Sequence, residues 1–376
     1  MLKKHLLVTG LLFFLLLFIC RLAYPKIIRT PAQKVVENIR HKGIEKAYFI
    51  TYRKTMSEMD HSGDKKIDIT ENREQILNAL NDCEFFPLDL ASSCEAEGKF
   101  QILSGGEEIE IWYSCAGFKI DKPLAIGEFS CSSLMRFANG LLIDEKLRVF
   151  SQEDFKKAAL EFAAKGNEIA LMSLPEWQIK EGIPLIFEKL SMGAKKKTFW
   201  LAELSRFKDI QNQDWIKKVI PFLKSNDPNS VLRAADILNN WGQRRRLNDL
   251  AQNKEYVSLT LISWLSQKRD DKTAEKAIAL LMPEKCKIKD AYILLGVSSK
   301  TAYLKLADII EYHGNELYLN LVTDTADSMG MEYDFIRKKF VPKGAATDGG
   351  WNIKEVRLQS KIIAEGLRNW AEKKWP

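Results

Sequence analysis

The segment Asp60–Glu71 (DHSGDKKIDITE) has the side chains and spacing that could bind calcium. Oxygen ligands occupy positions 1, 3, 5, 9 and 12 of this loop, which is the EF-hand spacing; the residues are Asp60, Ser62, Asp64, Asp68 and Glu71. However, Lys65 stands where an EF-hand needs glycine, and a strand rather than a helix is predicted before the loop. The sequence favours a polar turn that caps a following helix, with calcium as the alternative and no other cofactor indicated.

Four of the six cysteines fall in one acidic region, and they are Cys83, Cys94, Cys115 and Cys131. None forms a C-x-x-C pair, so zinc ribbons and thioredoxin-like chemistry have no support. One or two disulfides are the expectation in an oxidising compartment, and buried thiols are the alternative. Cys94 and Cys115 flank a predicted hairpin and are therefore the first candidates for a pair.

No complete catalytic motif accompanies these residues. The four histidines have no metal-ligand spacing, and G-x-S-x-G, P-loop and G-x-G-x-x-G patterns are missing. The acidic and aromatic run Glu108–Tyr113 would give a strand with one polar face, suited to a sugar or a peptide. The sequence favours a non-catalytic protein, and an enzyme with a dispersed site in the acidic region is the alternative.

Basic clusters lie near predicted helix ends, at Lys195–Lys197, Arg244–Arg246 and Arg337–Lys339. Cations near helix C-termini complement the helix dipole, so nucleic acid is not an expected partner.

The N-terminal run Leu6–Cys20 (LLVTGLLFFLLLFIC) is apolar and lies between Lys3-Lys4 and Arg21. Extended through Tyr24, it approaches the roughly 20 residues that a membrane helix needs. We expect an uncleaved single-pass anchor over residues 1–24, in a bacterial envelope, with the body outside the cytoplasm. A cleaved signal peptide and a lipoprotein acylated at Cys20 are the alternatives.

Composition and charge divide the rest of the chain. Its 376 residues, 46% of them hydrophobic, are enough for two folded domains. Positive charge dominates up to residue 42 and after residue 150, and negative charge dominates between them. The expected parts are the anchor, a basic stem (25–42), a small antiparallel α+β domain (43–150) and an all-α domain (151–376).

Local signals place the elements of both domains. The α+β domain has predicted strands at Lys46–Lys54, Glu97–Leu103 and Glu108–Ser114, the last two joined by a turn containing two glycines. From Ser151 onward the pattern is helical, with Ser151 and Asp227-Pro228 as helix starts.

One helical segment, Gln213–Gly242, resembles a HEAT-type repeat. The likeness lies in the Asp-Pro that opens its second helix and in Leu232-Arg233-Ala234-Ala235, and it extends more loosely over about 170–340. No family is recognised for residues 43–150. The resemblance implies an α-solenoid whose curved surface binds a protein partner. We therefore expect a membrane-anchored binding or scaffold protein, with an enzyme or a calcium-stabilised module as alternatives.

Overall fold

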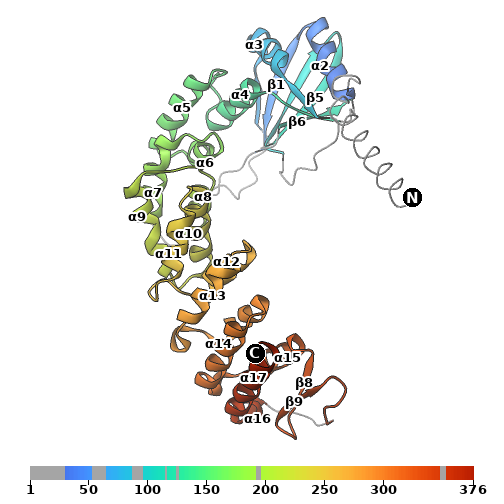
Figure 1. Ribbon diagram of the computed structural model, residues 1–376. Helices are drawn as coiled ribbons and strands as arrows, with labels where there is room; N and C mark the ends of the chain where they lie inside the picture. The colour runs from blue at the N-terminus through green and yellow to red at the C-terminus, as the bar shows by residue number, and fades with distance from the viewer. Residues whose placement is uncertain are drawn as a thin grey trace, which may run out of the picture. The chain divides into compact units, whose positions relative to one another are not determined.

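A computed structural model describes seven stretches of the chain, which are residues 30–52, 65–86, 96–114, 117–123, 127–191, 196–347 and 353–376 (Figure 1). The chain divides into two compact units, Met1–Leu185 and Ile186–Pro376. This division falls inside helix α7 (Ile183–Ser191), later than the boundary at residue 150 that the sequence favours.

The first unit contains a seven-stranded antiparallel sheet with the strand order β2-β1-β4-β5-β6-β7-β3. Its strands are β1 (Lys46–Thr51), β2 (Lys65–Asp68), β3 (Glu84–Phe86), β4 (Gly98–Ser104), β5 (Glu107–Ser114), β6 (Gly117–Lys122) and β7 (Glu128–Ser130). The predicted hairpin is confirmed as β4 and β5. Gly105 and Gly106 adopt positive φ at its turn, a conformation that costs little only for glycine.

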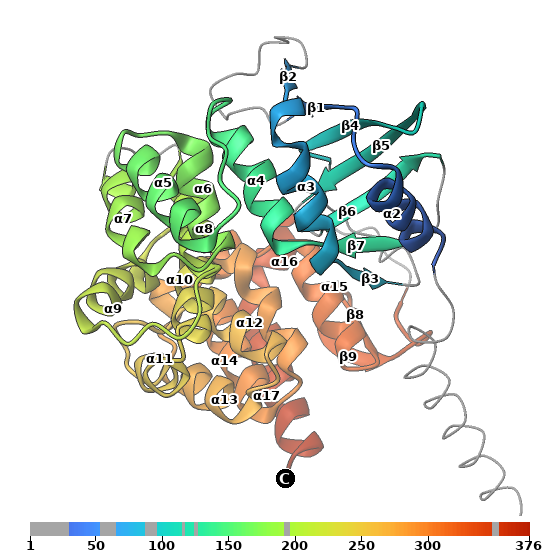
Figure 2. The same ribbon diagram turned by 90° about the horizontal axis from the view of Figure 1, so that it is seen from above.

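Helices cover one face of this sheet (Figure 2). They are α2 (Pro31–Lys42), α3 (Arg73–Ala79) and α4 (Ser132–Ile143). Side chains alternate along each strand, so β4 buries Phe100 and Ile102 under the helices and turns Lys99 and Gln101 to the other face. Phe100 packs against Phe49 of β1, and their ring centroids are 4.8 Å apart. Two further helices, α5 (Gln152–Ala164) and α6 (Glu168–Glu176), complete the unit with the start of α7.

The second unit is mainly helical. Its helices are α8 (Lys197–Ser205), α9 (Gln213–Val219), α10 (Pro228–Asn240), α11 (Arg244–Ala251), α12 (Leu259–Gln267), α13 (Asp271–Leu280), α14 (Lys300–Tyr312), α15 (Leu319–Ser328), α16 (Ile353–Leu358) and α17 (Ser360–Lys374). The predicted start of α10 is confirmed, because the carboxylate of Asp227 accepts hydrogen bonds from the backbone N–H groups of Asn229 and Ser230. Ala234 and Ala235 are buried, whereas Arg233 is exposed.

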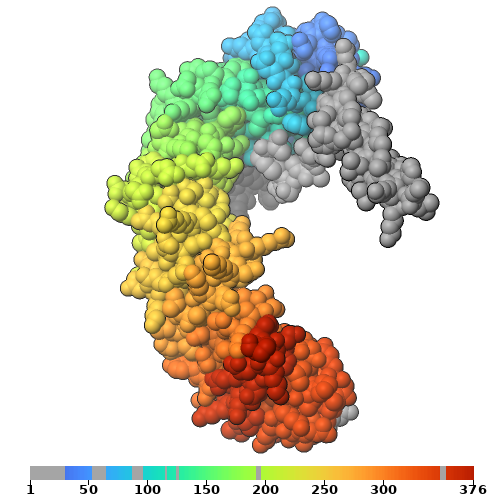
Figure 3. Space-filling view, in the orientation of Figure 1, coloured from blue at the N-terminus to red at the C-terminus, as the bar shows by residue number. Residues whose placement is uncertain are grey.

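The last helix packs along α14, and Figure 3 shows α17 in dark red against the orange surface of that helix. Arg368 of α17 donates to Asp308 at 2.9 Å and to Glu311 at 2.6 Å. The rings of Trp370 and Trp375 lie 5.0 and 5.5 Å from that of Tyr303. These contacts hold the C-terminal end of the chain against the body of the second unit.

Two parts of the predicted fold class need correction. The second region is not all-α, because β8 (Met331–Asp334) and β9 (Lys339–Pro342) form an antiparallel pair. No helix in the stretches that the structure describes is long and apolar enough to cross a membrane. The single-pass anchor and the membrane location predicted from it are therefore not supported. Residues 1–24, on which that prediction rested, lie outside the described stretches.

Candidate functional site

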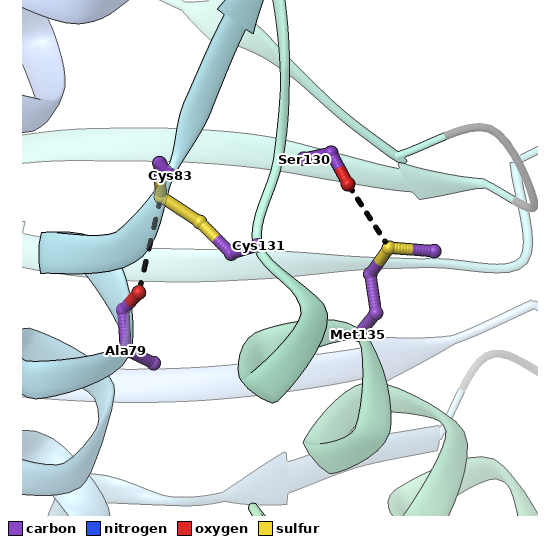
Figure 4. The surroundings of a disulfide bond; sticks show 5 residues. All are labelled: Ala79, Cys83, Ser130, Cys131 and Met135. Atoms are coloured by element: carbon purple, nitrogen blue, oxygen red, sulfur yellow. Dashed lines mark hydrogen bonds between the residues drawn. A yellow bond between two sulfur atoms is a disulfide. The ribbon is translucent and has the colours of Figure 1, made fainter.

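The predicted cysteine pair is not tested, because Cys94 and Cys115 lie outside the described residues. The structure instead joins Cys83 to Cys131 (Figure 4). Cys83 precedes β3 and Cys131 follows β7, and the register of these antiparallel strands, Glu84 opposite Ser130, places the two cysteines opposite each other. Their Cα atoms are 4.5 Å apart, within the range that a disulfide spans. The bond therefore fixes the last strand of the sheet to the start of α4.

The predicted calcium loop is described only in its second half. Asp60, Ser62 and Asp64 lie outside the described residues. The next four residues form β2, and Asp68 accepts a hydrogen bond from the backbone N–H of Thr70 at 2.9 Å. That bond lowers the pKa of the Asp68 carboxyl, and Glu71 follows in a 3₁₀ turn. Calcium binding stays a prediction. The predicted helix cap is not found, because the 3₁₀ turn begins after Ile69 and α3 after Asn72, and neither residue caps its helix through its side chain.

Chemistry that needs clustered ligands or raised carboxyl pKa values is not visible in the described stretches. They contain no group of three or more His, Cys, Asp or Glu side chains placed to hold a metal ion. Every carboxyl group there with a clearly shifted pKa is shifted downward; the residues are Asp68, Glu110, Glu161, Glu181, Asp227, Glu255, Asp270 and Asp334. A dispersed catalytic site in the acidic region gains no support from these groups.

A hollow of about 680 Å³ lies in the second unit, among α15, β8, the β8–β9 turn, α16 and the first turn of α17. These elements gather near the C-terminal end of the chain (Figure 1). We call this hollow the C-terminal groove; its lining is Thr323, Ala326, Asp327, Met331, Glu332, Tyr333, Phe335, Ile336, Lys338, Ala346, Thr347, Glu355, Leu358, Gln359 and Ile362. Its volume lies within the range of sites that hold a ligand or several side chains of a partner.

The floor of the C-terminal groove is held by Tyr333 and Gln359, both of which are buried. The Tyr333 hydroxyl donates to Gln359 Oε1 at 3.0 Å, and Gln359 Nε2 donates to the carbonyl of Phe335 at 3.3 Å. Burial raises the pKa of Tyr333 to about 12, so this hydroxyl keeps its proton at neutral pH. Gln359 also lies between two helices, because α16 ends at Leu358 and α17 begins at Ser360.

One wall of the groove is fixed by Asp334, whose side chain is buried at the end of β8. Its Oδ1 accepts the backbone N–H groups of Ile336 and Arg337, and its Oδ2 accepts the N–H and hydroxyl of Thr347. The hydrogen bond from Arg337 is the main cause that lowers the pKa of Asp334 to about 2. One carboxylate therefore holds the β8–β9 turn and the segment after β9 in place.

The rim of the groove is apolar and exposed. Ile336 is 59% exposed, Leu358 85% and Ile362 39%. Tyr292, Tyr312 and Ile353 are the other large apolar residues exposed in the described stretches, and none of the three lines the groove. Half of these exposed residues thus surround one hollow, and a surface that groups apolar side chains in this way is typical of an interaction site.

The charged residues of the lining are mostly acidic. Asp327, Glu332 and Glu355 contribute carboxylates, and Lys338 contributes the ammonium group. Asp327 is paired with Lys343 at 2.8 Å. A ligand with an apolar surface and positive charge would therefore complement this groove.

Sequence reasoning missed this site. None of its residues belongs to a motif, and the turn from Phe335 to Lys338 has no glycine, proline or asparagine to announce a hairpin. Lys338 takes the positive φ that the turn requires. Leu358 and Ile362 are four positions apart, the spacing of core residues on a helix, so periodicity gives no signal that they are exposed.

Comparison with known proteins finds no family model, no curated protein and no solved structure that matches this chain. The HEAT-type interpretation of Gln213–Gly242 therefore stays a prediction that rests on the residues quoted for it.

Proposed function

We propose that this protein is a non-catalytic binding protein whose second unit holds a segment of a protein partner in the C-terminal groove. The observation that carries this proposal is the grouping of Ile336, Leu358 and Ile362, all exposed, around one hollow of about 680 Å³. Exposed apolar side chains are costly unless a partner covers them, and a rigid concave wall lowers the entropy lost when it does so.

The groove suits a protein segment better than a small polar molecule. Its walls offer apolar rims and a few charged groups, with no cluster of metal ligands or paired nucleophile and base in the described lining. The hydrogen bond that Asp334 accepts from Thr347 and the one that Gln359 donates to Phe335 preorganise the wall and floor, so binding need not order the site. The helices before the groove would act as its scaffold, in keeping with the solenoid that the HEAT-type resemblance implies.

The test is selection of random peptides displayed on phage, with the full chain as the target. We expect enriched peptides to bind in solution by fluorescence anisotropy, and to lose at least about tenfold in affinity when Leu358→Asp and Ile362→Asp are combined. Both side chains are exposed, so the double variant should fold. The matched control is Tyr292→Asp, which changes a residue of the same unit that is 55% exposed and lies outside the groove.

Two results would contradict the proposal. The first is a selection that enriches no peptide with measurable affinity for the full chain. The second is a set of enriched peptides whose affinity falls as much in the Tyr292→Asp control as in the groove variant, because that pattern would place the binding surface elsewhere.

A further inference from the structure

One edge of β8 borders the C-terminal groove. Successive side chains of a strand point to opposite faces, yet the consecutive residues Met331, Glu332 and Tyr333 all line the hollow. A hollow that is lined by residues from both faces of β8 lies along the edge of the strand rather than under one of its faces. β9 occupies the other edge, in the register Glu332 opposite Val341 and Tyr333 opposite Phe340.

The β8 edge beside the groove has no strand partner in the described part of the chain, where β8 and β9 form a sheet of two strands. In an antiparallel pair, alternate residues direct their N–H and C=O groups at the partner, so half of those groups on β8 point away from β9. No backbone hydrogen bond from another described segment reaches residues 331–334. A strand edge without a strand partner is a template for an added strand.

The side chains along this edge alternate in chemistry. Met331 and Tyr333 are apolar neighbours on one face, and Glu332 lies between them on the other. Residues of an added strand would stand directly opposite these three. An apolar residue fits opposite Met331 and Tyr333. A basic residue fits opposite Glu332, which lines the groove together with Asp327 and Glu355.

We propose that the partner segment binds as an extended strand paired with the groove edge of β8, and that it carries an apolar, a basic and an apolar residue in succession. This inference rests on the proposed function and specifies the conformation and the residue pattern of the segment that the groove binds. Main-chain hydrogen bonds to β8 supply affinity, and the rim residues Ile336, Leu358 and Ile362 cover the apolar side chains of the added strand.

The experiment uses the full chain and a short capped peptide of alternating valine and lysine. A second peptide replaces each lysine by glutamate, and we expect it to bind roughly five- to tenfold more weakly, because cross-strand attraction becomes repulsion. The variant Glu332→Lys should reverse this preference. Glu365→Lys, an exposed glutamate of α17 outside the groove lining, is the control and should leave the preference unchanged.

N-methylation tests the backbone pairing itself. Alternate amides of a strand point to opposite sides, so methylation of only the lysine amides or only the valine amides blocks one side at a time. We expect one of these two peptides to lose about tenfold or more in affinity and the other to keep it. If the two N-methylated peptides lose affinity equally, strand addition is wrong. The proposal would also be overturned if the chain forms a dimer and Glu332→Pro dissociates it, because a second copy of the chain would then occupy the β8 edge.

The two levels of the proposal fail in different ways. If library peptides bind at the groove but the valine–lysine peptide does not, strand addition with this specificity is wrong and the proposed function stands. If no library peptide binds, the proposed function itself fails.

Discussion

Loss of the Cys83–Cys131 disulfide should destabilise the first unit by about 4 kcal/mol. The bond joins residues 48 positions apart. In the chain-entropy treatment, a closed loop of that length removes about 13.6 cal/mol/K from the unfolded chain, or about 4 kcal/mol at 25 °C. Alanine at both positions is the suitable replacement, because Cys131 is fully buried and a serine hydroxyl there would have to be desolvated.

The assay is urea unfolding of the full chain followed by hydrogen exchange and mass spectrometry, which gives separate readings for each unit. For a slope of about 2 kcal/mol per molar urea, 4 kcal/mol corresponds to a fall of about 2 M in the midpoint for peptides from β4 and β5. Peptides from α10 belong to the second unit and act as the internal control, with no expected change. Reduction of the wild-type chain should lower the midpoint of the first unit by at least as much as the Cys83→Ala/Cys131→Ala variant does.

Reducing agent added to that double variant extends the experiment to the pair predicted from sequence. A further fall in the midpoint for β4 and β5 would reveal a second disulfide, as expected for Cys94–Cys115, and no further fall would leave Cys83–Cys131 as the bond that matters. The reasoning is refuted if reduction leaves the midpoint of the first unit unchanged, or if a non-reducing peptide map fails to find Cys83 linked to Cys131.

Four further predictions concern the second unit. Burial raises the pKa of Cys286 to about 12, so its thiol should resist maleimide at pH 8 in the folded chain and react after unfolding, as mass spectrometry would show. The pKa of the Asp334 carboxyl is lower in the folded chain than its value of about 4 in the unfolded chain. The stability that Asp334 contributes is therefore present above about pH 4 and should be lost as the pH falls towards 2. Hydrogen exchange of β8 should show this acid-dependent loss in the wild type and not in Asp334→Asn. Asp227→Ala removes the N-cap of α10 and should cost about 1 kcal/mol in urea unfolding. Arg368→Ala breaks two ion pairs with α14 and should cost up to about 1 kcal/mol, whereas Lys361→Ala, at an exposed position of the same helix, should cost less than about 0.5 kcal/mol.

Local signals predicted local structure well. The hairpin of β4 and β5, the capping of α5 by Ser151 and the start of α10 at Asp227 each depend on residues close together in the sequence, and each is found. The strands β8 and β9 were missed because four residues are too few to show a periodic pattern against a helical background.

The Cys83–Cys131 disulfide was not predicted, and the predicted pair lies outside the described residues. Cys94 and Cys115 were favoured because they flank a hairpin that local sequence reveals. Cys83 and Cys131 become neighbours only because β3 pairs with β7 at the far end of the sheet order, and no local pattern sets that order. The same limit applies to the calcium loop, where oxygen spacing is visible in sequence but the strand β2 across positions 65–68 is fixed by its pairing with β1.

The C-terminal groove shows why a binding surface of this kind stays hidden in one sequence. Leu358 and Ile362 have the spacing of core residues, and sequence periodicity assigns such residues to the interior. They are exposed because Gln359 ends α16 and turns its side chain down to Tyr333 and the carbonyl of Phe335, which fixes how α16 and α17 meet beside β8. The exposure therefore depends on a hydrogen bond between residues 26 positions apart. Gln359→Leu removes this hydrogen bond, and we expect it to close the groove. Peptide affinity should then fall although the rim residues Ile336, Leu358 and Ile362 are unchanged. An unchanged affinity would mean that the rim residues alone make the site.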